Sequence, residues 1–250
     1  MEFNLIFFVF AVPAVLFAAI SKGGFGSGAA FAATPLLAMI LEPGHAVGLM
    51  LPLLMLMDVT NLRPYWRKWD WRNGKVLILG AAPGTLAGAL IYEVADADFF
   101  RLMIGSVALG FVLFQAARRL GWLTPKPRPF QPLWGGFWGF IAGITSFISH
   151  AGGPPVAVYL LGQNVSKTSY QATSVLVFWV VNWMKFVPYA FLGIFTLDTL
   201  KADLLLAPVA VIGSFLGVYA HRLMPERLFF GLTYVLLLLT GAKLIYDGLA

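Results

Sequence analysis

The stretch Ser21-Lys22-Gly23-Gly24-Phe25-Gly26-Ser27-Gly28 interrupts an apolar segment close to the beginning of the chain. A second stretch, Ser149-His150-Ala151-Gly152-Gly153-Pro154-Pro155, interrupts another apolar segment in the second half. Glycine-rich runs of this kind end helices, because glycine favours turns and proline suits only the first turn of a new helix. We therefore expect one broken helix in each half of the chain.

The sequence around both breaks has the composition of a membrane protein. Hydrophobic residues make up 60% of the 250 positions, mean hydropathy is +0.83, and charged residues make up only 11%. Soluble proteins carry about 25% charged residues, and a soluble fold of this size could not bury so much apolar surface. The apolar residues show no alternation with polar ones, which argues against a transmembrane β-barrel. The sequence thus predicts an all-α polytopic membrane protein.

Five apolar segments precede the basic stretch at 118–128 and five follow it. The second segment of each half is too short for a comfortable crossing, so we expect a re-entrant or broken helix there. The predicted domains are a first membrane repeat (1–123), a cytoplasmic linker (124–131) and a second membrane repeat (132–250). The segments lie near 3–20, 29–41, 45–62, 76–92 and 101–117, then 132–149, 154–162, 168–193, 204–220 and 228–246.

The two halves share weak but ordered sequence similarity, which indicates an internal repeat. An offset of 124 residues aligns Asp58 with Asn182, and it also aligns Gly28 with Gly152. Further along, an offset of 129 aligns the Gly84-x-x-x-Gly88 pair with Gly213-x-x-x-Gly217. Such small-residue pairs allow close helix packing, either within one chain or between the subunits of a homo-oligomer.

The distribution of charge predicts that the two repeats have opposite orientations in the membrane. Positive residues favour cytoplasmic loops, and one orientation places 12 loop Lys and Arg residues inside and two outside. Equivalent loops then lie on opposite sides, so the repeats are inverted and both chain termini are extracytoplasmic. The net charge of +6 fits basic loops facing anionic lipid, so we expect no nucleic-acid partner.

The two breaks form the predicted substrate site. Helix N-termini inside a membrane present free N–H groups and a partial positive charge, which attract anions. Lys22 could add charge or be an interfacial lysine, and His150 could bind an anion or be a hydrogen-bonded core histidine. The predicted binding residues are Ser21, Lys22, Gly23, Gly24, Gly26, Ser27, Gly28, Ser149, His150, Gly152, Gly153 and Pro154.

Four further polar residues lie within predicted membrane segments: Asp58, Asn61, Asn182 and Lys185. Polar groups at this depth are costly and usually face a partner or a transport pathway. Asp58 could form an ion pair with Lys185 or with Lys22, or it could carry a proton. We expect these four residues to form a coupling or ion-pair cluster, although an interfacial location is the alternative.

The Gly-rich turn and the following residues of Ser21–Leu37, together with Ser149–Leu161 and the duplicated layout, resemble the TauE/SafE family of sulfite and organosulfonate exporters. The resemblance covers nearly the whole chain. It implies a secondary transporter in the bacterial plasma membrane, which exports a small anion such as sulfite or sulfoacetate by alternating access. The Gly pattern differs between the halves, which puts symmetric substrate contacts in doubt.

Other functions remain as alternatives. The substrate could be another small anion or an organic acid, and a membrane scaffold or an intramembrane enzyme represents a different class. We expect no catalytic residues, because no paired acids or metal-ligand motif supports an enzyme. The sequence has no cysteine and three histidines, and we expect no metal and no cofactor. The expected partners are the anion and membrane lipid.

Overall fold

A computed structural model describes residues 3–25, 30–123, 129–223 and 226–250, and it describes the backbone alone for residues 25, 218, 220–223 and 226–230. Within these ranges the chain is helical and contains no strand. The helices are α1 (Leu5–Ile20), α2 (Ala33–Ala38), α3 (Pro43–Tyr65), α4 (Trp71–Val94), α5 (Ala97–Arg119), α6 (Pro132–Ser149), α7 (Gly153–Leu161), α8 (Lys167–Phe191), α9 (Leu197–Leu223) and α10 (Glu226–Leu249).

The predicted all-α polytopic membrane fold is confirmed. Each of the ten predicted apolar segments corresponds to one helix. Seven helices in the described part of the chain are long and apolar enough to cross a membrane, whereas α2 and α7 are short. Several helices begin where a polar side chain accepts a hydrogen bond from a free backbone N–H group, as helix N-caps do. The capping residues are Asn4 for α1, Asp70 for α4, Asp96 for α5 and Ser166 for α8.

The first break differs in detail from the sequence prediction. Residues Ser21–Phe25 do not leave the helix but continue α1 as a π-helical turn, and the chain resumes with a 3₁₀ turn at Ala30–Ala32 before α2. Gly23 in this turn packs directly against α9, where a Cβ atom would lie 3.3 Å from the Cα of Gly217. The second break follows the prediction, since α6 ends at Ser149 and α7 begins at Gly153.

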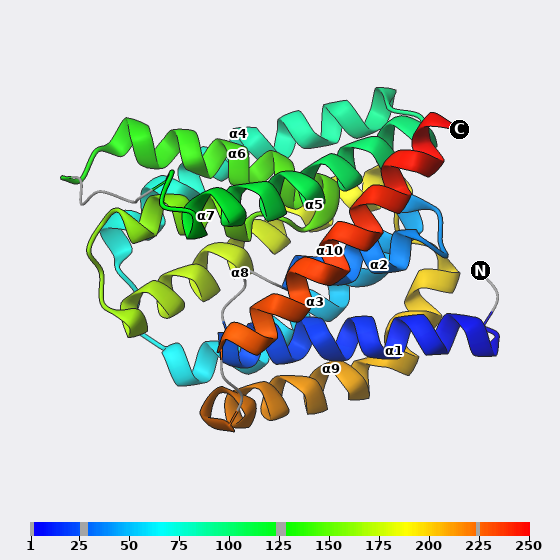
Figure 1. Cartoon of the computed structure of the whole chain (residues 1–250), viewed down its shortest axis with the longest axis horizontal. Coiled ribbons are helices and arrows are strands. Elements are labelled where there is room, and N and C mark those ends of the chain that lie inside the picture. Colours follow the sequence, from blue (N-terminus) through cyan, green and yellow to red (C-terminus); the bar gives the residue numbers. More distant parts are fainter. Residues whose placement is uncertain (1–2, 26–29, 124–128, 224–225) are drawn as a thin grey trace.

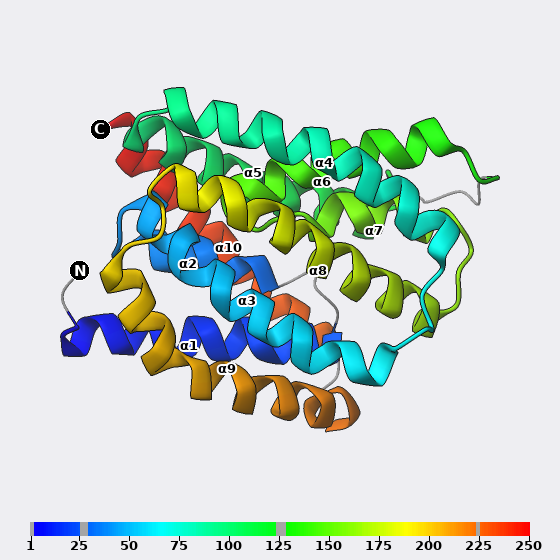
Figure 2. The same cartoon turned by 180° about the vertical axis from the view of Figure 1, so that it is seen from behind.

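Both chain ends lie at the same end of the helix bundle (Figures 1 and 2), whereas the passage from α3 to α4 lies at the opposite end. In Figure 1, α1 and α3 run from right to left, and their counterparts α6 and α8 run from left to right. These directions are the ones that two inverted repeats require. They support the predicted repeat, while the side of the membrane on which the termini lie stays a prediction, as do the domain boundaries.

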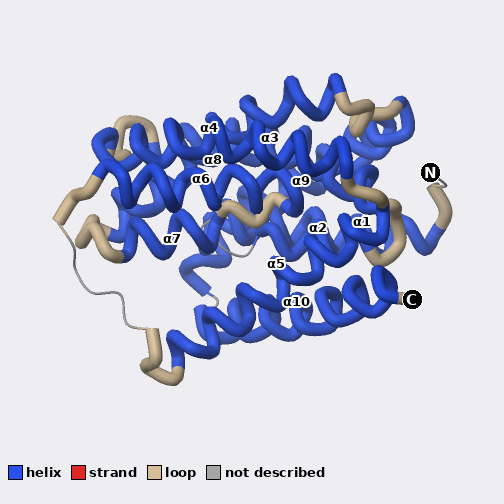
Figure 3. Tube along the Cα trace, turned by 90° about the horizontal axis from the view of Figure 1, so that it is seen from above, coloured by secondary structure: helices blue, strands red, loops and turns tan. Residues whose placement is uncertain are grey.

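The contacts between helices also match when each helix of the first half is compared with its counterpart in the second half. Helix α1 packs against α9, and α6, the counterpart of α1, packs against α4, the counterpart of α9. Likewise α3 contacts α9 and α8 contacts α4, while α5 and α10 pair with each other along one edge of the bundle (Figure 3). The contacts of α1 and α3 with α9 in this way have counterparts in the contacts of α6 and α8 with α4.

Glycines bring the paired helices into backbone contact. A Cβ atom at Gly84 would collide with the backbone of Phe140, and one at Gly213 would lie 3.1 Å from Leu16. Leu16 and Phe140 are themselves separated by the offset of 124 residues. The two Gly-x-x-x-Gly pairs thus serve packing within the chain, and the same contact occurs once in each pair of helices.

We expect residues 68 and 93 to be accessible from opposite sides of the membrane. Both are exposed, Lys68 in the loop between α3 and α4 and Glu93 at the far end of α4. The chain has no cysteine, so Lys68→Cys and Glu93→Cys variants can be labelled without background. An impermeant thiol reagent should label Glu93→Cys in intact cells and Lys68→Cys only after permeabilisation. The reverse pattern would invert our assignment of the cytoplasmic side.

Candidate functional site

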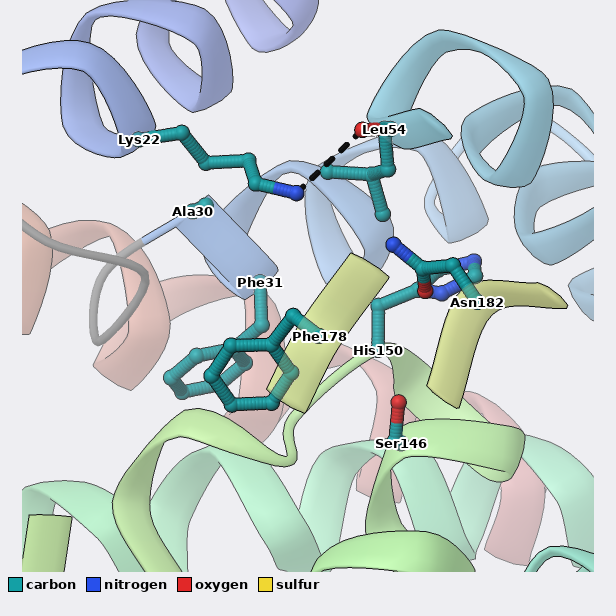
Figure 4. Close-up of a pocket in the computed structure, with 8 residues that line it drawn as sticks. All are labelled: Lys22, Ala30, Phe31, Leu54, Ser146, His150, Phe178 and Asn182. Atoms are coloured by element: carbon teal, nitrogen blue, oxygen red, sulfur yellow. Dashed lines mark hydrogen bonds between the residues drawn. The ribbon is translucent and has the colours of Figure 1, made fainter. Parts of the chain in front are cut away.

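A small cavity lies where the two breaks meet, enclosed by elements from both halves (Figure 4). The first break contributes one cationic side chain, the second break contributes a histidine, and α3 and α8 complete the wall. The volume is about 20 Å³, which is room for about one water molecule. An oxyanion is larger, so the surrounding helices must separate to admit one. The lining residues are Lys22, Ala30, Phe31, Leu54, Ser146, His150, Phe178 and Asn182.

Lys22 forms a buried ion pair at one side of this cavity. Its ammonium group lies 2.5 Å from Oδ1 of Asp58, and it donates a hydrogen bond of 3.2 Å to the carbonyl oxygen of Leu54. The other carboxylate oxygen of Asp58 accepts a hydrogen bond of 2.6 Å from the side-chain amide of Asn182. Both lysine and aspartate are buried, so each charge depends on the other for compensation.

The contact between Asp58 and Asn182 joins the two halves at equivalent positions. These residues lie on α3 and α8 and are separated by the offset of 124 residues. In an inverted repeat, equivalent residues meet only on the axis that relates the repeats. The contact agrees with the predicted inverted repeat, which stays a prediction.

Lys185 is the centre of a second set of buried hydrogen bonds near the cavity. Its side chain is fully buried on α8, and its ammonium donates to the carbonyl oxygen of Ser146 at 3.2 Å and to Nδ1 of His150 at 2.7 Å. Because Nδ1 accepts this bond, the ring proton of His150 resides on Nε2, which donates to the carbonyl oxygen of Val47 at 3.0 Å. Histidine is therefore neutral here, and both of its ring nitrogens are engaged.

His150 reaches this position through an unusual backbone conformation. It ends α6 with a φ angle of 56°, in the left-handed region that residues other than glycine seldom adopt. Such conformations are concentrated at functional sites. The turn directs the ring back toward α3 and α8, where Val47 and Lys185 hold it.

The structure brings together only part of the predicted site. Lys22, His150 and Asn182 line the cavity, and Asp58 and Lys185 form hydrogen bonds or ion pairs with all three. Asn61 is buried on α3, and its side-chain nitrogen has no hydrogen-bond partner among the described residues. The remaining predicted residues do not line the cavity or lie outside the described ranges.

Several of those remaining residues have packing or capping contacts. Ser149 is buried and donates to the carbonyl oxygen of Thr145, and Gly152 lies against the ring of Phe178. Ser21, Gly23 and Gly24 belong to the π-helical turn. Gly23 contacts α9, as described above. Gly153 and Pro154 form the first turn of α7. Gly26, Ser27 and Gly28 lie outside the described residues.

Sequence reasoning missed five lining residues, and the internal offset could have identified one of them from a predicted residue. Ser146 is the counterpart of Lys22, and Phe178 is the counterpart of Leu54 at the same separation of 124 residues. Applying the offset to Lys22 would therefore have predicted Ser146. The apolar residues Ala30, Phe31 and Leu54 carry no signal that separates them from other core residues.

A polytopic helical fold with a buried cavity that receives charged and polar side chains between two interrupted segments is typical of a membrane transporter. The chain belongs to the sulfite exporter TauE/SafE family, whose sequence model matches residues 11–244. The resemblance found in the sequence is thereby confirmed over nearly the whole chain. The protein is a multi-pass membrane protein of an anion-exporting transporter family. No curated protein and no solved structure matches the chain.

Proposed function

We propose that this protein exports sulfite or an organosulfonate across the bacterial plasma membrane. The single observation that supports this function is the cavity between the breaks, which receives Lys22 from one half and His150 from the other. The ammonium group of Lys22 and the hydroxyl group of Ser146 suit an oxyanion, since both can donate hydrogen bonds to its oxygens. Another small anion or organic acid would fit the same chemistry. A scaffold would have no use for such a cavity.

Transport through so small a cavity requires a change of conformation. A volume of about 20 Å³ is too small for an oxyanion, so the proposed transport cycle needs a second conformation in which the cavity is larger. Outward movement of an anion is favoured by the negative interior of a bacterial cell, by about 2.3 kcal/mol per charge at 100 mV. Export could therefore proceed without a coupling ion.

Filling the cavity should stop transport. Leu54 lines it from α3, so a Leu54→Trp variant would occupy the space that an anion needs, whereas Leu54→Met conserves volume and should cost less than about 1.5 kcal/mol of stability. We expect uptake of radiolabelled sulfite or sulfonate into inside-out proteoliposomes to be lost with Leu54→Trp and retained with Leu54→Met.

The stability of both purified variants serves as the control for this experiment. A folded Leu54→Trp protein that transports at the normal rate would show that substrate does not pass this cavity. A wild-type protein that transports none of the tested anions would exclude the proposed function itself.

A further inference from the structure

The buried groups around the cavity carry an unbalanced positive charge. Lys22 is neutralised by Asp58, with which it forms an ion pair at 2.5 Å. Lys185 has no carboxylate within ion-pair distance among the described residues, and its two hydrogen-bond partners are a carbonyl oxygen and a neutral histidine. Counted in their ordinary ionised forms, these groups are two ammonium groups and one carboxylate beside an uncharged imidazole, which leaves one excess positive charge.

An unpaired charge in the interior of a membrane protein is costly, and one counter-charge removes that cost. A bound monoanion would balance the net charge of the group. A dianion would leave one excess negative charge, and a neutral molecule would leave the positive charge uncompensated. Lys185 does not line the cavity, but its two acceptors belong to Ser146 and His150, which do. Its charge thus lies directly behind the cavity wall.

From this arrangement we propose that the site selects monoanions over dianions and neutral molecules, and that Lys185 is the positioning residue that sets this selectivity. The inference rests on the proposed anion site between the two breaks and adds the charge of the ligand to it. A monoanionic sulfonate or hydrogensulfite is then the form that binds.

Three ligands of nearly the same size separate charge from shape. Dimethyl sulfone, methanesulfonate and sulfate each place four small groups around sulfur and carry charges of zero, minus one and minus two. Calorimetry on the purified full-length protein should give the tightest binding for methanesulfonate. We expect each of the other two to bind about tenfold more weakly or worse, which is the range of one charge-assisted hydrogen bond.

Two substitutions should change the ligand charge that the site prefers, one toward neutral ligands and the other toward dianions. Lys185→Met removes the unbalanced charge, so the advantage of methanesulfonate over dimethyl sulfone should fall about tenfold. Asp58→Asn releases the charge of Lys22, so the ratio of sulfate to methanesulfonate affinity should rise by a similar factor. Lys201→Met provides a matched control, because Lys201 is 66% exposed and far from any buried partner of the cavity.

A purely structural role for Lys185 would lower the affinity for all three ligands equally in Lys185→Met, and that result would overturn the inference. Tightest binding of sulfate by the wild-type protein would overturn it too. In both cases the anion site would stand, so the proposed function survives. Failure of all three ligands to bind would overturn the proposed site together with this inference. If Asp58→Asn does not fold, the Lys185→Met measurement decides the question alone.

Discussion

Replacing Asp58 with alanine is expected to abolish transport and to lower the free energy of unfolding by about 3–5 kcal/mol. The carboxylate is fully buried, and each of its oxygens has a partner, Lys22 on one side and Asn182 on the other. Without it, the Lys22 ammonium would remain buried with only the carbonyl oxygen of Leu54 as an acceptor. The link between α3 and α8 would be lost at the same time.

A double-mutant cycle separates the ion pair from the rest of the network. We expect Lys22→Met and Asp58→Asn each to destabilise the protein strongly, and the double variant to be more stable than either, because it leaves no unpaired charge. Lys185→Met is the informative comparison, since it removes a buried charge that has no carboxylate partner and should cost less than Lys22→Met. Denaturation of the detergent-solubilised protein measures all four variants. Additive effects of the two single substitutions would contradict a direct ion pair.

Adding one methyl group at Gly139 is expected to cost about 1–3 kcal/mol of stability and to reduce the amount of folded protein. Gly139 lies on α6 where a Cβ atom would overlap the backbone of Leu77 on α4, and backbone cannot move aside as a side chain can. Gly136 lies one turn earlier on the same helix, and a Cβ atom there would meet nothing within 4 Å.

Gly136→Ala is therefore the matched control for Gly139→Ala. It should be neutral or stabilise the protein by up to about 1 kcal/mol, because alanine loses less entropy than glycine when a helix forms. Thermal unfolding of both variants in the same detergent tests this difference. Equal stabilities would mean that α4 and α6 are not in backbone contact at Gly139.

Most of the fold could be predicted because the signals that determine it are local. Apolar segments of membrane-spanning length and polar caps such as Asp70 and Asp96 mark helices without reference to any distant residue. The π-helical turn at Ser21–Phe25 could not be predicted in this way. A run of glycines indicates a break, but here the backbone of Ser21–Phe25 stays helical and Gly23 packs against α9, a contact with a residue distant in the sequence.

The charged residues of the candidate site could be predicted from the sequence, but the ion pairs and hydrogen bonds between them could not. Lys22, Asp58 and Lys185 are conspicuous because charged groups are rare in apolar segments. The sequence left open whether Asp58 pairs with Lys22 or Lys185, since that choice depends on how the π-helical turn approaches α3. It also could not indicate that both nitrogens of His150 are occupied, because Val47 lies 103 residues away in the chain.

The glycine-lined pairing of α1 with α9 and of α4 with α6 also has a consequence for biogenesis. Each of these interfaces joins a helix made early to one made later, so α1 enters the membrane long before its partner has been synthesised. Until then, the surface of α1 and of the following π-helical turn that contains Gly23 must remain in contact with lipid or with another protein. The first half alone lacks both partners, so a chain truncated before α6 should be a substrate for quality-control proteolysis. The two halves expressed as separate polypeptides should assemble with each other more readily than either assembles alone.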